Sequence, residues 1–154
     1  MGGKKFQSSF LGAIVALGCY LLPASVQASN VIGLWATEEE KSHVEIKACE
    51  GDENKLCGTI VWLKEPLNDE GEPKTDRNNP EKALQERQII GLPLMADFEK
   101  TDDPNVWEEG KIYNPEDGET YSCVITLLKA DLLEVRGYVG LPLLGKSQEW
   151  TRVK

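Results

Sequence analysis

The sequence predicts an all-β protein: a single small antiparallel barrel in which about eight strands run up and down, with one short helix in a long loop. Apolar and polar residues alternate with a period of two after residue 28. Turn-forming clusters such as Gly51-Asp52 and residues 114–118 interrupt this alternation at short intervals. A barrel is the simplest arrangement because closure removes the exposed edges of the sheet.

Eight segments carry the period-two pattern, and each has the length of an ordinary strand. We expect strands at residues 31–36, 43–49, 57–63, 92–99, 106–114, 120–128, 132–139 and 146–153. Strict alternation places Gly58, Ile60 and Trp62 on one face of their strand.

The N-terminus has the pattern of a secretory signal peptide. Lys4 and Lys5 precede an apolar stretch at residues 10–22, and small residues lead to a cleavage site after Ala28. The apolar stretch would span ~20 Å as a helix, less than the ~30 Å hydrocarbon core, so we expect no stable membrane span after cleavage. The predicted division is a signal peptide at 1–28 and a barrel domain at 29–154. A competing interpretation makes Cys19 the acylated cysteine of a lipoprotein.

The charge of the chain limits its partners. The whole chain has a net charge of −9, and removal of residues 1–28 takes away two lysines and no acidic residue, which leaves −11. Such a domain is repelled by nucleic acid and by anionic lipid surfaces, so neither is expected as a partner. The export signal places the protein in the periplasm or outside the cell.

The cysteines indicate an oxidising compartment. Cys49 and Cys57 flank a polar turn at residues 50–55, so two strands folding back across it would bring them together as a disulfide. Metal binding is the alternative, but His43 is the one histidine of the chain, and no metal site is expected. Cys123 lies in an apolar stretch and is predicted to be a small buried residue.

Two further features could serve a ligand or simply the fold. Residues 64–88 are rich in charge and turn formers, and Asn79 followed by Pro80 indicates the start of the short helix. This segment is a lid, a binding surface or a plain surface insertion. The tetrapeptide Gly-Leu-Pro-Leu occurs at residues 91–94 and again at 140–143. Its two copies are either corners that bend a strand or an apolar rim around an opening.

Six motifs in order resemble an exported bacterial family. They are Gly33-Leu34-Trp35, residues 56–63, residues 91–93, residues 112–122, residues 135–140 and Trp150-Thr151-Arg152. The chain resembles the family catalogued as domain of unknown function 2147 (DUF2147) over about 31–154. The resemblance implies a secreted or periplasmic protein with a lipocalin-like barrel and no established activity.

A lipocalin-like barrel implies a structural pair at one of its ends. In such barrels the indole of a Gly-x-Trp motif in the first strand packs against an arginine of the last strand. Here Gly33 and Trp35 stand near the start of the domain and Arg152 near its end. The cation–π contact would be worth ~0.5–2 kcal/mol and would close the barrel without any catalytic role.

The sequence favours binding over catalysis. It contains no nucleophile motif, no phosphate-binding glycine loop and no His–Glu metal motif, so no enzyme activity and no cofactor are expected. We predict a binding module for a small hydrophobic or amphipathic ligand. The candidate ligand-binding residues are Trp62, Trp107, Tyr113, Arg136 and Tyr138. The alternative is a ligand-free envelope interaction or stress module that docks a protein partner through its acidic loop and Gly-Leu-Pro-Leu corners.

Overall fold

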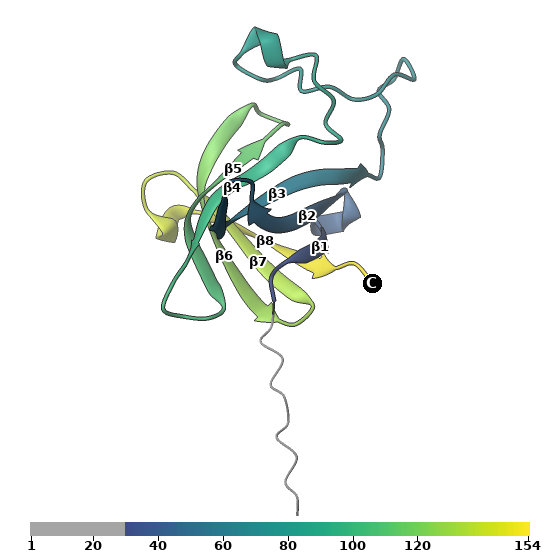
Figure 1. The fold of residues 1–154 in the computed structure, drawn as a ribbon. Coiled ribbons are helices and arrows are strands. Elements are labelled where there is room, and N and C mark those ends of the chain that lie inside the picture. Colours follow the sequence, from purple (N-terminus) through teal and green to yellow (C-terminus); the bar gives the residue numbers. More distant parts are fainter. Residues whose placement is uncertain (1–29) are drawn as a thin grey trace, which may run out of the picture.

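The protein is a closed antiparallel barrel, in which each strand pairs with its neighbour in sequence and the last pairs with the first. The computed structural model describes residues 30–154. The predicted signal peptide and Cys19 lie outside these residues. Figure 1 shows the barrel with the long loop at one end and the start of the described chain at the other. The strands are β1 Gly33–Ala36, β2 Ser42–Cys49, β3 Asp52–Leu63, β4 Pro93–Lys100, β5 Val106–Asn114, β6 Glu119–Lys129, β7 Leu132–Tyr138 and β8 Lys146–Arg152.

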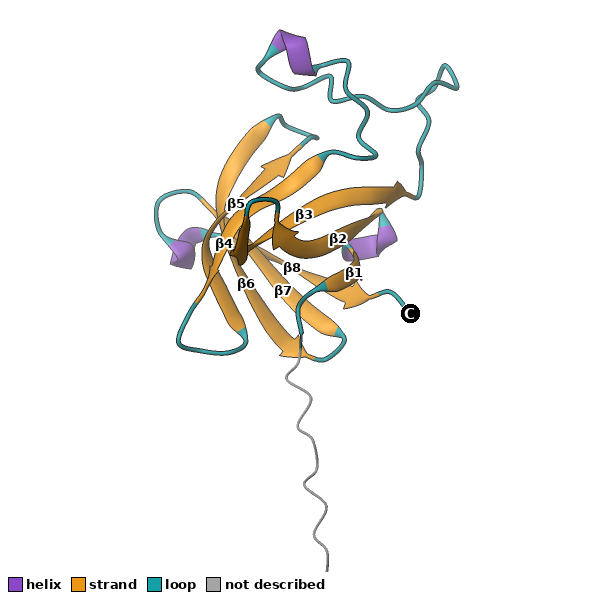
Figure 2. Cartoon of the chain, in the orientation of Figure 1, coloured by secondary structure: helices purple, strands orange, loops and turns teal. Residues whose placement is uncertain are grey.

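The predicted fold class is confirmed, and most strand ends lie within two residues of their predicted positions. The larger differences are at the start of β3 and in the long loop. The turn between β2 and β3 is only Glu50 and Gly51, so β3 begins five residues earlier than expected. The short helix in the long loop is a single 3-10 turn, η2, at Lys82–Leu84 (Figure 2). Asn79 does accept a hydrogen bond from the Glu81 N–H. The backbone of Glu81 is extended, however, and the helical turn that follows is not continued.

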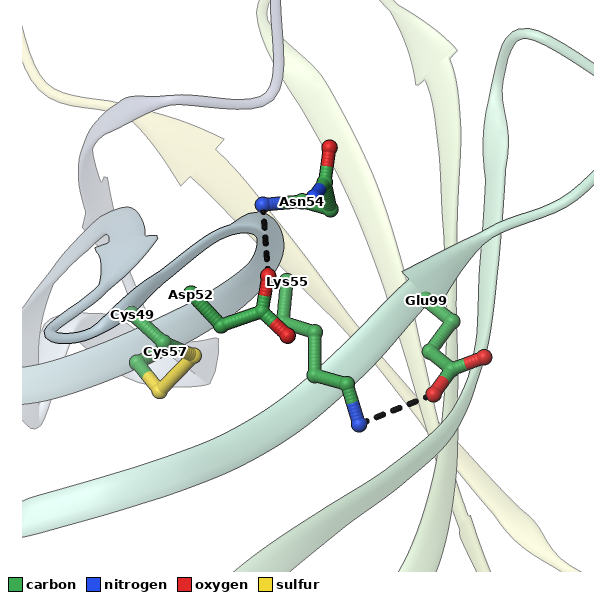
Figure 3. Close-up of a disulfide and its surroundings, with 6 residues drawn as sticks. All are labelled: Cys49, Asp52, Asn54, Lys55, Cys57 and Glu99. Atoms are coloured by element: carbon green, nitrogen blue, oxygen red, sulfur yellow. Dashed lines mark hydrogen bonds and ion pairs between the residues drawn. A yellow bond between two sulfur atoms is a disulfide. The ribbon is translucent and has the colours of Figure 1, made fainter.

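The predicted disulfide between Cys49 and Cys57 is present and holds the β2–β3 hairpin (Figure 3). Its Cα atoms are 4.9 Å apart, across a stretch where the pairing register shifts between Ala48 and Cys49. Beside it, Lys55 of β3 and Glu99 of β4 form an ion pair at 2.9 Å. These contacts fix an otherwise irregular hairpin at the end of the barrel where the chain enters.

The seam between β1 and β8 closes the barrel with two residue pairs, Trp35 with Arg152 and Ala36 with Thr151. The Arg152 guanidinium lies 4.3 Å from the centroid of the Trp35 ring. It also donates hydrogen bonds to the backbone carbonyls of Ala130, Ile32 and Asn30. Arg152 therefore joins the last strand to the first strand, to the entering chain and to the β6–β7 turn.

Apolar side chains fill the half of the barrel next to this seam. The fully buried apolar residues in this part of the barrel are Val31, Trp35, Val44, Ile46, Met95, Phe98, Cys123, Ile125, Leu133 and Trp150. The Trp35 indole N–H donates to the Val31 carbonyl at 2.8 Å, so its one polar group is satisfied inside the core. We call this the closed end.

A β-bulge in β3 changes which side chains face the interior. Val44 pairs with Ile60 but His43 pairs with Trp62, so Val61 is an extra residue on β3. Trp62 therefore turns to the outer surface, where its ring stacks on His43 with centroids 4.3 Å apart. The expectation that Trp62 shares a face with Ile60 is wrong because the bulge interrupts the alternation.

A second bulge, in β5, lies between Trp107 and Gly110. After it, Gly110 pairs with the buried Cys123, so the inward positions shift by one. Strict alternation would place Trp107 and Tyr113 on one face of β5, and the bulge places them on opposite faces. The ring of Phe98 occupies the space that a side chain at Gly110 would need.

The long loop at residues 64–92 is tied to the barrel by a buried carboxylate. Asp76 is fully buried and pairs with Arg87 at 2.8 Å. It accepts further hydrogen bonds from the Tyr113 hydroxyl at 2.6 Å and the Asn79 amide at 2.8 Å. Burial, followed by the hydrogen bond to Asp76, raises the pKa of Tyr113, so its hydroxyl remains a donor at neutral pH.

A second tether joins the loop to the β5–β6 turn. The Asn78 amide donates to the carbonyls of Pro115 and Glu116 at 3.2 and 2.9 Å. The Asn78 carbonyl lies against Gly118, whose φ of +76° and missing side chain allow this approach. The loop is therefore fastened beside the β5–β6 turn, at the end of the barrel opposite the closed end.

A first prediction compares two strand glycines. Gly110→Ala should lower the free energy of unfolding by about 1–3 kcal/mol, because the new methyl group collides with the Phe98 ring. Gly137→Ala is the matched control, since its Cβ would be 3.7 Å from its nearest neighbours, an ordinary contact. Urea unfolding measures both, and equal stability of the two variants would contradict the packing described.

A second prediction concerns the buried carboxylate. Asp76→Ala leaves Arg87 and the Tyr113 hydroxyl without their acceptor and should cost about 3 kcal/mol, as when one partner of a buried pair is removed. Trypsin should then cut the loop at Arg77, Lys82 and Arg87 much faster than in the parent protein. Asp69→Ala, at an exposed acid of the same loop, should leave cleavage unchanged. Equal cleavage of both variants would show that Asp76 does not hold the loop.

Candidate functional site at the open end of the barrel

The end of the barrel opposite the closed end is open. The loops that surround it lie at residues 37–41, 64–92, 115–118 and 139–145. Between them the interior forms a cavity of about 530 Å³. This volume falls within the range of ~300–1,000 Å³ that is usual for small-molecule sites.

The cavity has an apolar floor and a polar rim. Its floor and walls include Trp150, Val135, Leu94 and Ile112, which project inward from β8, β7, β4 and β5. Trp150 is 1% exposed and separates the cavity from the filled half of the barrel. Residues at the rim carry hydroxyl, amide and charged groups: Glu38, Lys41, Tyr113, Glu116, Asp117, Tyr121, Tyr138, Lys146 and Gln148.

Asp117 provides a fixed negative charge at the rim. Burial raises its pKa, but hydrogen bonds from the Glu119 N–H, the Tyr121 hydroxyl and the Asn114 amide outweigh that effect and hold the pKa below its ordinary value. The hydrogen bond to Asp117 in turn raises the pKa of Tyr121. This carboxylate stays ionised at neutral pH.

A second cavity, of about 560 Å³, lies under the long loop and shares Lys41, Pro115 and Glu116 with the first. Cationic side chains gather around it: Lys41, Lys64, Lys74 and Arg77. Glu39 pairs with Lys41 at 3.2 Å and Glu65 with Lys74 at 3.6 Å. With Glu116, the lining therefore holds three acidic and four cationic side chains, so positive and negative charges nearly balance in this cavity.

The structure brings two of the predicted ligand-binding residues to the main cavity, Tyr113 and Tyr138. The others lie elsewhere. Trp62 is on the outer surface, and Trp107 is 7% exposed within the core cluster. Arg136 points to the β7–β8 loop, where it donates hydrogen bonds to the carbonyls of Pro142 and Leu143.

Sequence reasoning missed Trp150, Tyr121 and Asp117 as cavity residues. Trp150 could have been found, because the alternation of β8 places it on the same face as Gln148, and both line the cavity. The sequence pattern predicts Asp117 only as a turn residue. Its place at the rim depends on how the β5–β6 turn folds over the opening.

The two Gly-Leu-Pro-Leu copies have opposite environments. In the first copy Leu92 is 1% and Leu94 is 8% exposed, so this copy belongs to the core and offers no docking surface. In the second, Leu141 is 65% and Leu143 is 86% exposed. Only the second copy is an apolar feature of the rim.

The free cysteine and the possible metal ligands of residues 30–154 form no reactive site. Cys123 is fully buried, and burial raises the pKa of its thiol to about 12, so it is not a nucleophile at neutral pH. Among residues 30–154, His, Cys, Asp and Glu side chains form no cluster of three or more that could hold a metal ion. The helical turns of this part of the chain are too short to cross a membrane.

Comparison with known proteins supports the barrel and identifies the family. No curated protein matches the sequence significantly. Among solved structures, protein HP1028 from the human pathogen Helicobacter pylori, described as belonging to the lipocalin family, is similar in fold. The similarity has a TM-score of 0.68 and 24% sequence identity over 81% of this chain and 84% of that chain.

The family comparison covers most of the barrel. The model of the family described as "Uncharacterized protein conserved in bacteria (DUF2147)" matches residues 33–152, from the glycine that begins β1 to the arginine that ends β8. The matched segment includes both partners of the seam and all the loops of the open end. The chain therefore belongs to the DUF2147 family.

Proposed function

We propose that this protein is an extracytoplasmic binding module that holds one small hydrophobic or amphipathic ligand in the open end of its barrel and catalyses no reaction. The observation that carries the proposal is the cavity of about 530 Å³ with an apolar floor and a polar rim. An amphipathic molecule fits such a site with its apolar part against Trp150 and Val135 and its polar end at the rim.

The barrel itself supports a site for a single ligand. Eight strands enclose an interior just wide enough for side chains or for one small molecule. Here buried side chains fill the closed end, and the open end holds the cavity. The similarity in fold to a protein of the lipocalin family agrees with this use, because lipocalins hold one small ligand in an eight-stranded barrel.

The rim chemistry supports recognition of a polar group. Lys41 and Lys146 supply positive charge at the cavity, and the hydroxyls of Tyr113 and Tyr138 supply neutral hydrogen-bonding groups. The pKa of Lys41 is raised by its hydrogen bond to Glu39, so it stays protonated. Because Lys41 pairs with Glu39 and the rim also carries Glu38, Glu116 and Asp117, the best match is a ligand whose polar end is hydroxylated or carries a single negative charge next to Lys146.

The proposed compartment rests on the disulfide and on the N-terminal sequence. A disulfide such as Cys49–Cys57 persists where the surroundings are oxidising, as in the periplasm or outside the cell. The basic and apolar pattern of residues 1–28 is that of an export signal.

A cavity-filling substitution tests the site. Gly137 lines the cavity on β7, and a side chain added there meets only ordinary contacts before it enters the cavity. Gly137→Phe should therefore weaken binding of a dansyl-labelled fatty acid by about tenfold or more, since its ring occupies ligand space. Fluorescence titration measures the affinity, and circular dichroism checks that the variant is folded.

The matched control places the same ring outside the barrel. Glu134 is on β7 and pairs with Thr126 and Glu149, away from the inward positions Leu133 and Val135. Glu134→Phe should bind the labelled fatty acid like the parent protein. Equal affinity of both variants, or no saturable binding by the parent protein, would refute a ligand site in this cavity.

A further inference from the structure

The β7–β8 loop presents an apolar tip that the fold does not bury. Its exposed side chains are Val139, Leu141, Leu143 and Leu144, which are 75%, 65%, 86% and 76% exposed. Figure 1 shows this loop in yellow, projecting from the barrel, and its helical turn η3 (Pro142–Leu144) is purple in Figure 2. Apolar groups concentrated in this way on one projecting loop mark a site of interaction.

Several backbone carbonyl and N–H groups of this tip form hydrogen bonds within the protein. Arg136 donates from Nε to the Pro142 carbonyl at 2.7 Å and from Nη2 to the Leu143 carbonyl at 3.1 Å. The N–H groups of Leu144 and Gly145 donate to the carbonyls of Leu141 and Pro142. Pro142 itself has no N–H. Carbonyls that enter hydrocarbon must keep a hydrogen-bond partner, and these have one within the protein.

The charges around the tip match a phospholipid surface. The stretch from Gly137 to Gly145 contains no charged residue, and Arg136 and Lys146 stand directly on either side of it. Tyr138, within the stretch, is a residue type enriched where lipid headgroups meet hydrocarbon. Flanking cations suit lipid phosphates, whereas the net charge of −9 for the whole chain disfavours a strongly anionic surface.

A protein partner fits the tip less well. The apolar side chains belong to a single projecting loop. A standard protein interface needs ~800 Å² from each partner, which is more than four aliphatic side chains supply. A bilayer has no such requirement, since each apolar side chain that enters it contributes separately.

We propose that residues 139–145 dock the open end of the barrel onto the surface of a zwitterionic phospholipid bilayer. Val139, Leu144 and Gly145 also line the main cavity, so a docked tip brings the cavity opening to the lipid. The contact goes beyond the proposed function: it depends on the loop alone, and an empty cavity would leave it intact.

A local fluorescent probe tests this contact. In the full chain, Leu143→Cys is labelled with the environment-sensitive fluorophore NBD, and phosphatidylcholine vesicles are added. The matched control is Asp102→Cys, in the exposed β4–β5 loop at the closed end, with the same label. Both chains also carry Cys19→Ser, so that the label attaches only to the introduced cysteine and reports on that position alone.

The expected result is a rise in intensity of about twofold or more and a blue shift for the label at position 143, with no change at position 102. Adding Leu144→Asp to the labelled Leu143→Cys chain should raise the lipid concentration needed for half of the change by about tenfold. No response at position 143, or the same response at both positions, would overturn the proposal. A blue shift that depends on protein concentration without vesicles would also overturn it, because a second copy of the chain would then cover the tip.

Discussion

The contact of Arg152 with Trp35 is the interaction on which the rest of the barrel depends. β1 meets β8 over only two residue pairs, so backbone pairing alone gives this seam little support. Arg152 adds a cation–π contact at 4.3 Å and hydrogen bonds to three carbonyls from two other segments. Gly33 is part of the same arrangement, because its φ of +142° and lack of a side chain leave room for the guanidinium. A lysine could not reach all of these acceptors, since it lacks the planar fork of donors.

The seam and the packed core hold the barrel together at its closed end, so the opposite end does not need to be filled. Large buried side chains, including Trp35 and Trp150, pack inside the barrel beside the seam, where β1 and β8 share only two residue pairs. Beyond Trp150 the same strands continue as the walls of the cavity, and the loops around it carry many of the polar and charged groups of the rim. The Asp76 network fastens the longest loop beside the opening, and the Arg136 hydrogen bonds shape the apolar tip. The scaffold and the binding surface thus use different residues of the same strands.

The strand positions could be predicted from the sequence, because period-two alternation is a local signal. The disulfide could be predicted too, because its two cysteines flank one short turn. The seam joins residues far apart in the chain, and only the resemblance to lipocalin-like barrels implied it. The cavity lining could be predicted only in part. Ile60, Val61, Trp62 and Leu63 are all apolar, so the sequence cannot show where the bulge reverses the inward face. The β5 bulge separates Trp107 from Tyr113 in the same way. The position of Arg136 depends on a loop that folds back six residues later, which no alternation pattern encodes.

The central claim is that the half-filled barrel holds a ligand in its open end. Native mass spectrometry of the protein isolated from the organism that makes it tests this most directly. The account predicts a bound species of a few hundred daltons that organic solvent extracts and that is absent when Gly137 is replaced by phenylalanine. Repeated spectra that contain only the bare polypeptide mass would contradict it.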